Sequence, residues 1–237
     1  MNVIFSLAAV MMIAAISIYI VLNVGKPAID SASLASQIVT SESFLKSLDN
    51  QINEVMKEGS GSRRVFAFNV QDSYEVSDEE DSIIYEKTIT PEVMDYQSSV
   101  ISGSLAFVSG FQVNCFESDE TGDGTSDLVM ENPFIKAVFM KVAKASPMAA
   151  IRTNETFISL KEKSGGSMIN FTNSSVLIDG NSTSFNGTGY TEILKTGYNK
   201  PFCIIHMFVN STPALYDVFY MLYSSSDFIV ADVRNIR

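Results

Sequence analysis

The oxygen-rich segment Asp119–Asp127 has the residue types and spacing of a calcium-binding loop. With Asp119 as position one, oxygen donors fall at positions one, three, five, seven and nine, and Gly124 stands at position six, where such loops turn sharply. The ligands would be Asp119, Thr121, Asp123, the carbonyl of Thr125, and Asp127. Met130 replaces the bidentate glutamate of position twelve, so the pattern departs from an EF-hand. An acidic turn that binds no metal fits the same residues.

Six Asn-x-Ser/Thr tripeptides, the acceptor sequence for N-linked glycans, occur between residues 154 and 212. Their asparagines are Asn154, Asn170, Asn173, Asn181, Asn186 and Asn210. Because no asparagine elsewhere in the chain matches, the clustering favours glycosylation of one exported surface. The alternative is that asparagine, serine and threonine are common in the turns of β proteins. Asn210 is the least secure of the six because Pro213 follows its tripeptide.

The chain has two cysteines, Cys115 and Cys203, and both lie in strand-like segments. An exported chain with two cysteines usually pairs them, so we predict a disulfide between these residues. The alternative is two buried thiols. Their separation fits neither a metal site nor a redox pair.

The residue pattern does not predict an enzyme, a catalytic residue or a required cofactor. The only histidine, His206, lies in a segment that is apolar on both faces, where we expect a hydrogen-bonded core residue. The sequence contains no glycine-rich phosphate loop after a strand, and no zinc spacing. The formal charge of −11 argues against nucleic acid and anionic lipid as partners, because both require clustered lysine and arginine.

The N-terminal segment is strongly apolar. Met1–Val24 is an apolar run without a charged residue, and as a helix it would be roughly 36 Å long, enough to cross a bilayer. It fits a cleaved signal poorly, since no basic residue precedes Lys26. The other two interpretations are a plain membrane anchor and a helix that packs with copies of itself. Pro27 should loosen or kink the rod.

The spacing of apolar residues changes after Lys26. Leu34, Ile38, Leu45, Leu48, Ile52 and Val55 form one stripe on a helix that we expect to end at Gly59. Short strand-like runs separated by turn residues follow, with Phe202–Val209 and Leu215–Tyr223 apolar on both faces and therefore central. Val100–Val108 is predicted as one strand, and Ser164–Ser167 as a hairpin loop. The expected fold is α+β, a long N-terminal helix and then an antiparallel, sandwich-like head. The expected parts are an apolar helix (1–25), its amphipathic continuation (26–58) and a β-rich glycosylated head (59–237).

An uncharged apolar segment that begins at Met1, continues into an amphipathic helix and leads to a β-rich head resembles a mature archaeal type IV pilin. The resemblance covers about the first sixty residues and is one of architecture. It implies that a short basic leader has been removed before Met1. Bacterial pilins often carry a glutamate where this chain has Phe5, and archaeal relatives commonly lack it.

The resemblance implies a structural subunit of an extracellular filament, which polymerises through its apolar helix and presents a glycosylated head for surface attachment. The expected partners are other copies of the chain in a helical homopolymer, and the membrane before assembly. The expected location is the cell surface. The alternative function is a single-span, membrane-anchored cell-surface binding protein that does not polymerise.

Overall fold

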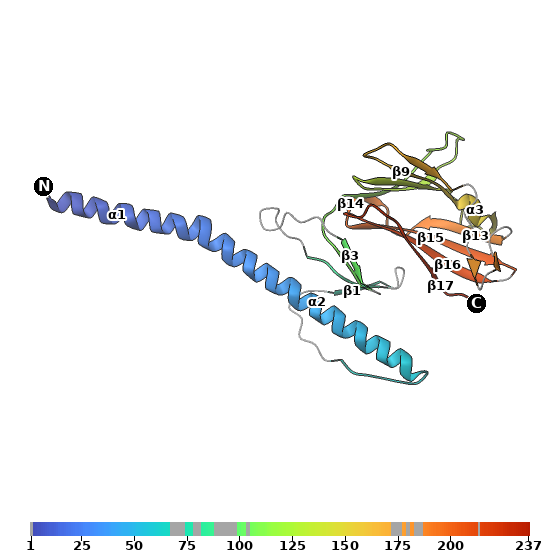
Figure 1. Ribbon diagram of the computed structural model, residues 1–237, viewed down its shortest axis with the longest axis horizontal. Coiled ribbons are helices and arrows are strands. Elements are labelled where there is room, and N and C mark those ends of the chain that lie inside the picture. Colours follow the sequence, from blue (N-terminus) through green and yellow to red (C-terminus); the bar gives the residue numbers. More distant parts are fainter. Residues whose placement is uncertain are drawn as a thin grey trace. The chain divides into compact units, whose positions relative to one another are not determined.

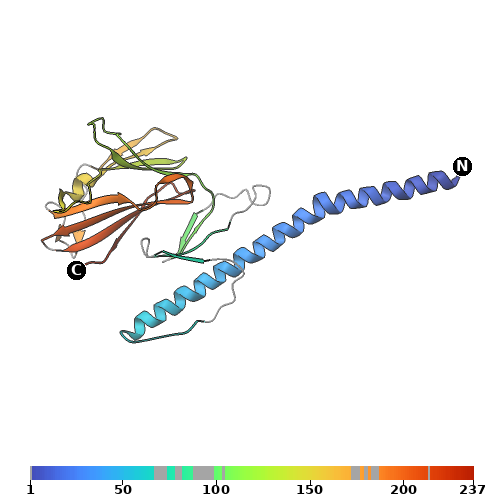
Figure 2. The ribbon, with the colours of Figure 1, turned by 180° about the vertical axis from the view of Figure 1, so that it is seen from behind.

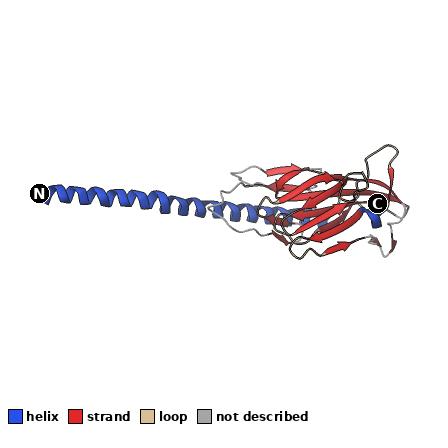
Figure 3. Ribbon diagram, turned by 90° about the horizontal axis from the view of Figure 1, so that it is seen from above, coloured by secondary structure: helices blue, strands red, loops and turns tan. Residues whose placement is uncertain are grey.

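The computed structural model describes residues 2–66, 74–77, 82–87, 99–102, 105–171, 177–178, 181–182, 187–212 and 214–237. The chain divides into two compact units, Met1–Asp95 and Tyr96–Arg237. A long helical rod precedes a domain made almost entirely of antiparallel strands, so the predicted α+β class is confirmed. Among the described residues, helix occurs in the N-terminal rod and in the single turn of α3 (Thr153–Thr156), as Figure 3 shows.

The rod of the first unit consists of α1 (Asn2–Ile20), the π-helical turn η1 (Val21–Gly25) and α2 (Lys26–Glu58), which follow one another without a break (Figure 1). Pro27 has no N–H to donate to the carbonyl four residues earlier. The wider π turn lies immediately before it, and the N–H of Lys26 bonds the carbonyl of Val21. The predicted irregularity at Pro27 therefore takes the form of a π turn. The rod ends at Gly59, as predicted, with a φ of 89°.

After Gly59 the chain turns back along α2 (Figure 2). Arg64 forms ion pairs with Glu54 and Glu58 of the last two helical turns. The ring of Phe44 contacts that of Phe66, with centroids 5.8 Å apart, and that of Tyr74, with centroids 4.9 Å apart. Tyr74 opens the hairpin of β1 (Tyr74–Ser77) and β2 (Ser82–Tyr85). Aromatic contacts therefore hold this hairpin on the amphipathic helix.

The second unit contains two larger sheets, which form two layers in Figure 1. The six-stranded sheet has the order β10-β9-β7-β6-β5-β14. Its strands are β5 (Val113–Ser118), β6 (Asp127–Glu131), β7 (Ile135–Phe139), β9 (Phe157–Glu162), β10 (Met168–Asn170) and β14 (Gly197–Lys200). The five-stranded sheet has the order β17-β16-β15-β13-β8. Its strands are β8 (Ala149–Ile151), β13 (Gly187–Ile193), β15 (Phe202–Ser211), β16 (Leu215–Tyr223) and β17 (Val230–Arg234).

The core lies between these two sheets. Alternate residues of β15, such as Ile205 and Met207, are fully buried, and so are Leu128 and Met130 of β6 on the opposing sheet. Strand β15 lies in the middle of its sheet with β16 as its neighbour, as their apolar sequences predicted. Gly189 has to be glycine, because a Cβ at this position would come within 2.0 Å of the carbonyl oxygen of Phe208.

Two minor hairpins complete the second unit. The single strand predicted at Val100–Val108 is wrong: β3 (Ser99–Ser102) and β4 (Leu105–Val108) form a hairpin. Ser102 pairs with Leu105 in the antiparallel register of this hairpin. The second hairpin joins β11 (Leu177–Ile178) and β12 (Asn181–Ser182). The loop predicted at Ser164–Ser167 is confirmed, since it connects β9 and β10.

Candidate functional site

The principal candidate site is the apolar surface of α1 and η1, which we call the apolar rod (residues 2–25). Every large apolar side chain between Phe5 and Val24 is at least 52% exposed. Among the described residues, one helix, Phe5–Glu58, is long and apolar enough to cross a membrane, and none of its apolar window is buried. The apolar rod is therefore suited to a membrane or to other apolar helices, since exposed apolar area costs about 25 cal/mol per Å² in water.

Two polar residues inside the apolar rod bond to the rod itself. The hydroxyl of Ser17 donates to the carbonyl of Ile13 at 2.8 Å, and the amide of Asn23 donates to the carbonyl of Tyr19 at 3.0 Å. Each bond satisfies a donor within the helix, four residues back. Such donors do not need water, so these two residues do not prevent the rod from entering an apolar environment.

The predicted disulfide is present. Cys115 of β5 and Cys203 of β15 are bonded, with their Cα atoms 5.8 Å apart. Both residues are buried, and the bond connects the six-stranded sheet to the five-stranded sheet. It is a structural link through the core, and it agrees with a membrane-anchored or secreted protein.

The acidic loop connects β5 to β6, so strands flank it. Its carboxylates accept hydrogen bonds from the loop itself. Asp119 accepts from the N–H groups of Gly122 and Gly124, at 2.7 and 3.0 Å. Asp127, which is 3% exposed, accepts from the N–H of Thr121 at 3.1 Å. The hydroxyl of Thr125 donates to Asp123 at 2.5 Å and lowers the pKa of this carboxyl.

Gly122 and Gly124 have φ angles of 74° and 85°, which fits the sharp turn expected at Gly124. In the part of the chain that the structure describes, no three His, Cys, Asp or Glu side chains are grouped closely enough to hold a metal ion. The hydrogen bonds within the loop account for its conformation without a cation. Calcium binding by this loop stays a prediction.

The described sequons lie at one end of the two-sheet domain. Gly187, next to Asn186 in the sequence, pairs with Ile151 of β8 and with Ser211 of β15. Ile151 lies three residues before Asn154, and Ser211 belongs to the Asn210 sequon. Asn170 pairs with Ser159, close to the start of β9, and β9 directly follows the α3 turn that contains Asn154. Asn181 begins β12, whereas Asn173 and Asn186 lie outside the described residues.

The exposure of these asparagines differs. Asn170 and Asn210 are exposed, and each lies in a strand with its side chain open to solvent. Asn154 is half-buried, and its side-chain oxygen is buried without a hydrogen-bond partner. Asn170 and Asn210 are therefore more accessible as acceptors than Asn154, and Pro213 follows the Asn210 tripeptide without interrupting it.

His206 lies in a polar cluster that sequence reasoning did not find. The ring is 8% exposed, with Nδ1 3.1 Å from a carboxylate oxygen of Glu192 and Nε2 2.8 Å from one of Asp217. A carboxylate only accepts, so both contacts are hydrogen bonds only when both ring nitrogens carry protons. The ring stacks on Phe219 with centroids 4.8 Å apart. Alternation along β13, β15 and β16 could have suggested one shared face, but the register that joins these three residues was not readable from the sequence.

His206 was expected to be a hydrogen-bonded residue, which is confirmed, but it faces outward from the five-stranded sheet because its neighbours Ile205 and Met207 face the core. Its partners in the described part of the chain are carboxylates and aromatic rings, and no serine or threonine hydroxyl contacts it there. The ring is therefore held between two carboxylates and against an aromatic face.

No protein-family model, curated protein sequence or solved structure matches this chain. The features that define the chain are an apolar rod whose large apolar side chains are exposed, followed by a disulfide-linked sandwich of two antiparallel sheets.

Proposed function

We propose that this chain is the structural subunit of an extracellular type IV pilus-like filament. One observation carries the proposal: the apolar rod exposes apolar side chains on all sides along its length. A helix that needed to bury only one face would have an apolar stripe, as α2 has. A helix that is apolar all round needs contacts on every side, and lipid or a bundle of like helices supplies them.

The need for apolar contacts on every side of the rod suggests how the chain would assemble. Before assembly, lipid would surround the apolar rod. After extraction, neighbouring copies would replace the lipid, and identical contacts that repeat head to tail without closing produce a fibre. The polar groups of Ser17 and Asn23 are already bonded within the helix, so they allow either environment. The sandwich unit, its disulfide and its sequons suit the outside of such a fibre.

The second candidate is a membrane-anchored surface protein that does not polymerise. The length of the apolar rod favours it equally, because 24 residues from Asn2 to Gly25 span roughly 36 Å and a hydrocarbon core is about 30 Å thick. The two proposals differ in the partner of the rod, which is lipid permanently in one and other copies in the other.

Electron microscopy of surface material from cells that produce the chain separates the two. Helical fibres labelled by an antibody against residues 96–237 are the expected result. Labelled membranes without fibres, from cells in which the chain is abundant and intact, would support the anchor and refute the filament.

A further inference from the structure

We propose that Asn210 carries an N-linked glycan whose first sugar packs on the ring of Phe208. The outer face of the five-stranded sheet would then bind the chain's own carbohydrate. The inference rests on the export of the chain that the proposed function requires. It goes further by naming one sequon and the surface that receives its sugar.

Strand β15 places the two residues on one face. Successive side chains of a strand point to opposite faces, so Phe208 and Asn210 share a side. Met207 and Val209, which alternate with them, are 0% and 1% exposed and face the core. Phe208 and Asn210 therefore both point outward. The aromatic residue thus lies two positions before the asparagine, about 7 Å away along the strand.

Small residues lie beside Asn210 on the side of β13, whereas on the side of β16 Asn210 pairs with Leu215. In β13 and β8, the residues that extend this row are Thr188, which pairs with Asn210, and Ala150, which pairs with Thr188. Both side chains are small, and cross-strand neighbours on one face lie only about 5 Å apart. One row further along, Tyr190 pairs with Phe208, and their rings stack with centroids 5.4 Å apart. A row of small residues on β8 and β13 therefore lies next to the stacked rings of Tyr190 and Phe208.

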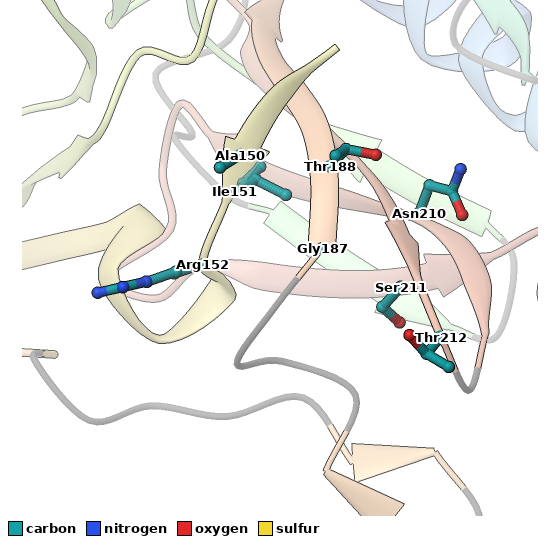
Figure 4. A pocket seen from close by; sticks show the side chains of 8 residues that line it. All are labelled: Ala150, Ile151, Arg152, Gly187, Thr188, Asn210, Ser211 and Thr212. Carbon is teal, nitrogen blue, oxygen red and sulfur yellow. The ribbon is translucent and has the colours of Figure 1, made fainter.

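An open groove of about 500 Å³ lies at the end of these strands, next to the stacked rings of Phe208 and Tyr190 but not lined by them (Figure 4). All three residues of the Asn210 sequon line the groove, together with Gly187 and Thr188, the last two residues of the Asn186 sequon. Figure 4 shows Thr188 on the strand beside Asn210, with Ser211 and Thr212 at the strand's end.

The chemistry of this surface suits a sugar ring. A pyranose has an apolar C–H face, which packs on aromatic rings, and a rim of hydroxyls that need polar partners. Phe208 supplies the ring, because the ring of Tyr190 is already stacked on Phe208 and lies under the ammonium of Lys144. Lys144, whose ammonium lies 4.5 Å from the centroid of Tyr190, and the hydroxyl of Thr188 supply polar groups at the edges. The surface therefore combines apolar and polar groups, as a sugar ring does.

The modification itself needs only a sugar donor. The side-chain nitrogen of Asn210 bonds to the anomeric carbon of the sugar and loses one proton. The bond that breaks joins this carbon to the phosphate of a lipid-linked sugar donor, and the phosphate leaves. Thr212 provides the hydroxyl that the acceptor tripeptide requires.

Asn170 is a matched control within the same domain. It is also an exposed strand residue in a sequon, but the residue two positions before it is Met168, which is 60% exposed and has no ring. A glycan at Asn170 would therefore have no aromatic seat on its own strand.

The test uses the full chain, made in a host with N-glycosylation and purified in detergent. Glycopeptide mass spectrometry measures occupancy at Asn210. Thermal unfolding of wild type, Phe208→Ala, Asn210→Gln and the double variant then forms a cycle, with Phe208→Leu as a second variant that keeps the apolar bulk. We expect Phe208 and Asn210 to be coupled by about 3 °C in the midpoint, and Met168 and Asn170 to be additive within about 1 °C.

An unmodified Asn210, or an additive cycle with both Phe208 variants, would overturn the proposal. Occupancy at other sequons separates this result from a failure of the proposed function. Glycans elsewhere with Asn210 bare reject the seat alone, whereas bare asparagines at all six sequons argue against export as well.

Discussion

Replacing Ala14 with aspartate tests whether the apolar rod assembles with other copies. Ala14 lies near the middle of the uncharged run in α1, and its small side chain suits a close helix contact. The nearest residue of opposite charge in the sequence is Lys26, twelve positions away and about 18 Å along the helix. A carboxylate at position 14 would therefore be unpaired within its own chain.

An aspartate at the centre of a membrane helix is unfavourable by about 2.5–3.5 kcal/mol on insertion-derived scales. Since about 1.4 kcal/mol is a factor of ten, the change should weaken burial of the rod on the order of a hundredfold. In a filament the same carboxylate would recur in every subunit. We therefore expect Ala14→Asp chains to lose fibres, while residues 96–237 keep their fold, because the core and the disulfide are formed by residues of that unit.

Negative-stain microscopy of surface preparations, with quantification of the chain by immunoblot, measures the effect. Ala35→Asp is the matched control, since it makes the same substitution at an exposed position of α2, within the amphipathic segment. This variant should assemble as wild type does. Normal fibres from Ala14→Asp chains would refute the assembly role of the rod, and so would loss of fibres with both variants to the same extent.

Four further predictions concern the sandwich unit. Cys115 and Cys203 should resist alkylation until reduction, which opens a loop of 88 residues and should lower stability by up to about 4–5 kcal/mol; two freely alkylated thiols in the native chain would contradict this. Asn132→Asp should lower the thermal midpoint by roughly 10 °C, because the buried amide donates to the carbonyl of Ser226 at 2.6 Å and a carboxylate cannot; an unchanged midpoint would refute it. Asp127→Ala should cost about 1–3 kcal/mol by calorimetry, and wild-type melts with calcium or chelator test the predicted metal loop, whose binding would raise the midpoint. Burial raises the pKa of Tyr220 to about 12, so the unfolded chain ionises first and stability should fall between about pH 10 and 12; Tyr220→Phe should flatten this slope in denaturant titrations, and an equal slope would exclude the residue as its cause.

The parts of the fold that the sequence predicts are those with long, one-sided or uninterrupted patterns. The rod and its end at Gly59 followed from helical spacing and a glycine stop. The central position of β15 and β16 followed from runs that are apolar on both faces, which only interior strands tolerate. The disulfide could be predicted because an exported chain usually pairs its cysteines, and two cysteines allow one pairing.

The remaining strands were harder because their signals depend on tertiary contacts. Asp127–Glu131 begins and ends with acidic residues, yet it is a central strand in which Asp127 is buried by its hydrogen bonds to the preceding loop. Asn132 is buried because its side chain bonds the backbone of residues 134 and 135 and of the chain near residue 224, more than 90 positions away. No local spacing contains this information, since the partners become neighbours only after the sheets have formed.

Buried polar side chains of this domain are structural where their hydrogen bonds are made within the protein. Asn132 and Asp127 have side-chain hydrogen bonds to protein partners, and the two ring nitrogens of His206 each lie near a carboxylate. Buried polar groups with satisfied bonds fix the position of loops and strands without offering a free reactive atom. The large unsatisfied feature of the chain is instead apolar, the rod from Asn2 to Gly25. The large apolar side chains between Phe5 and Val24 are exposed, and under the proposed function they are the groups that lipid or neighbouring copies would cover.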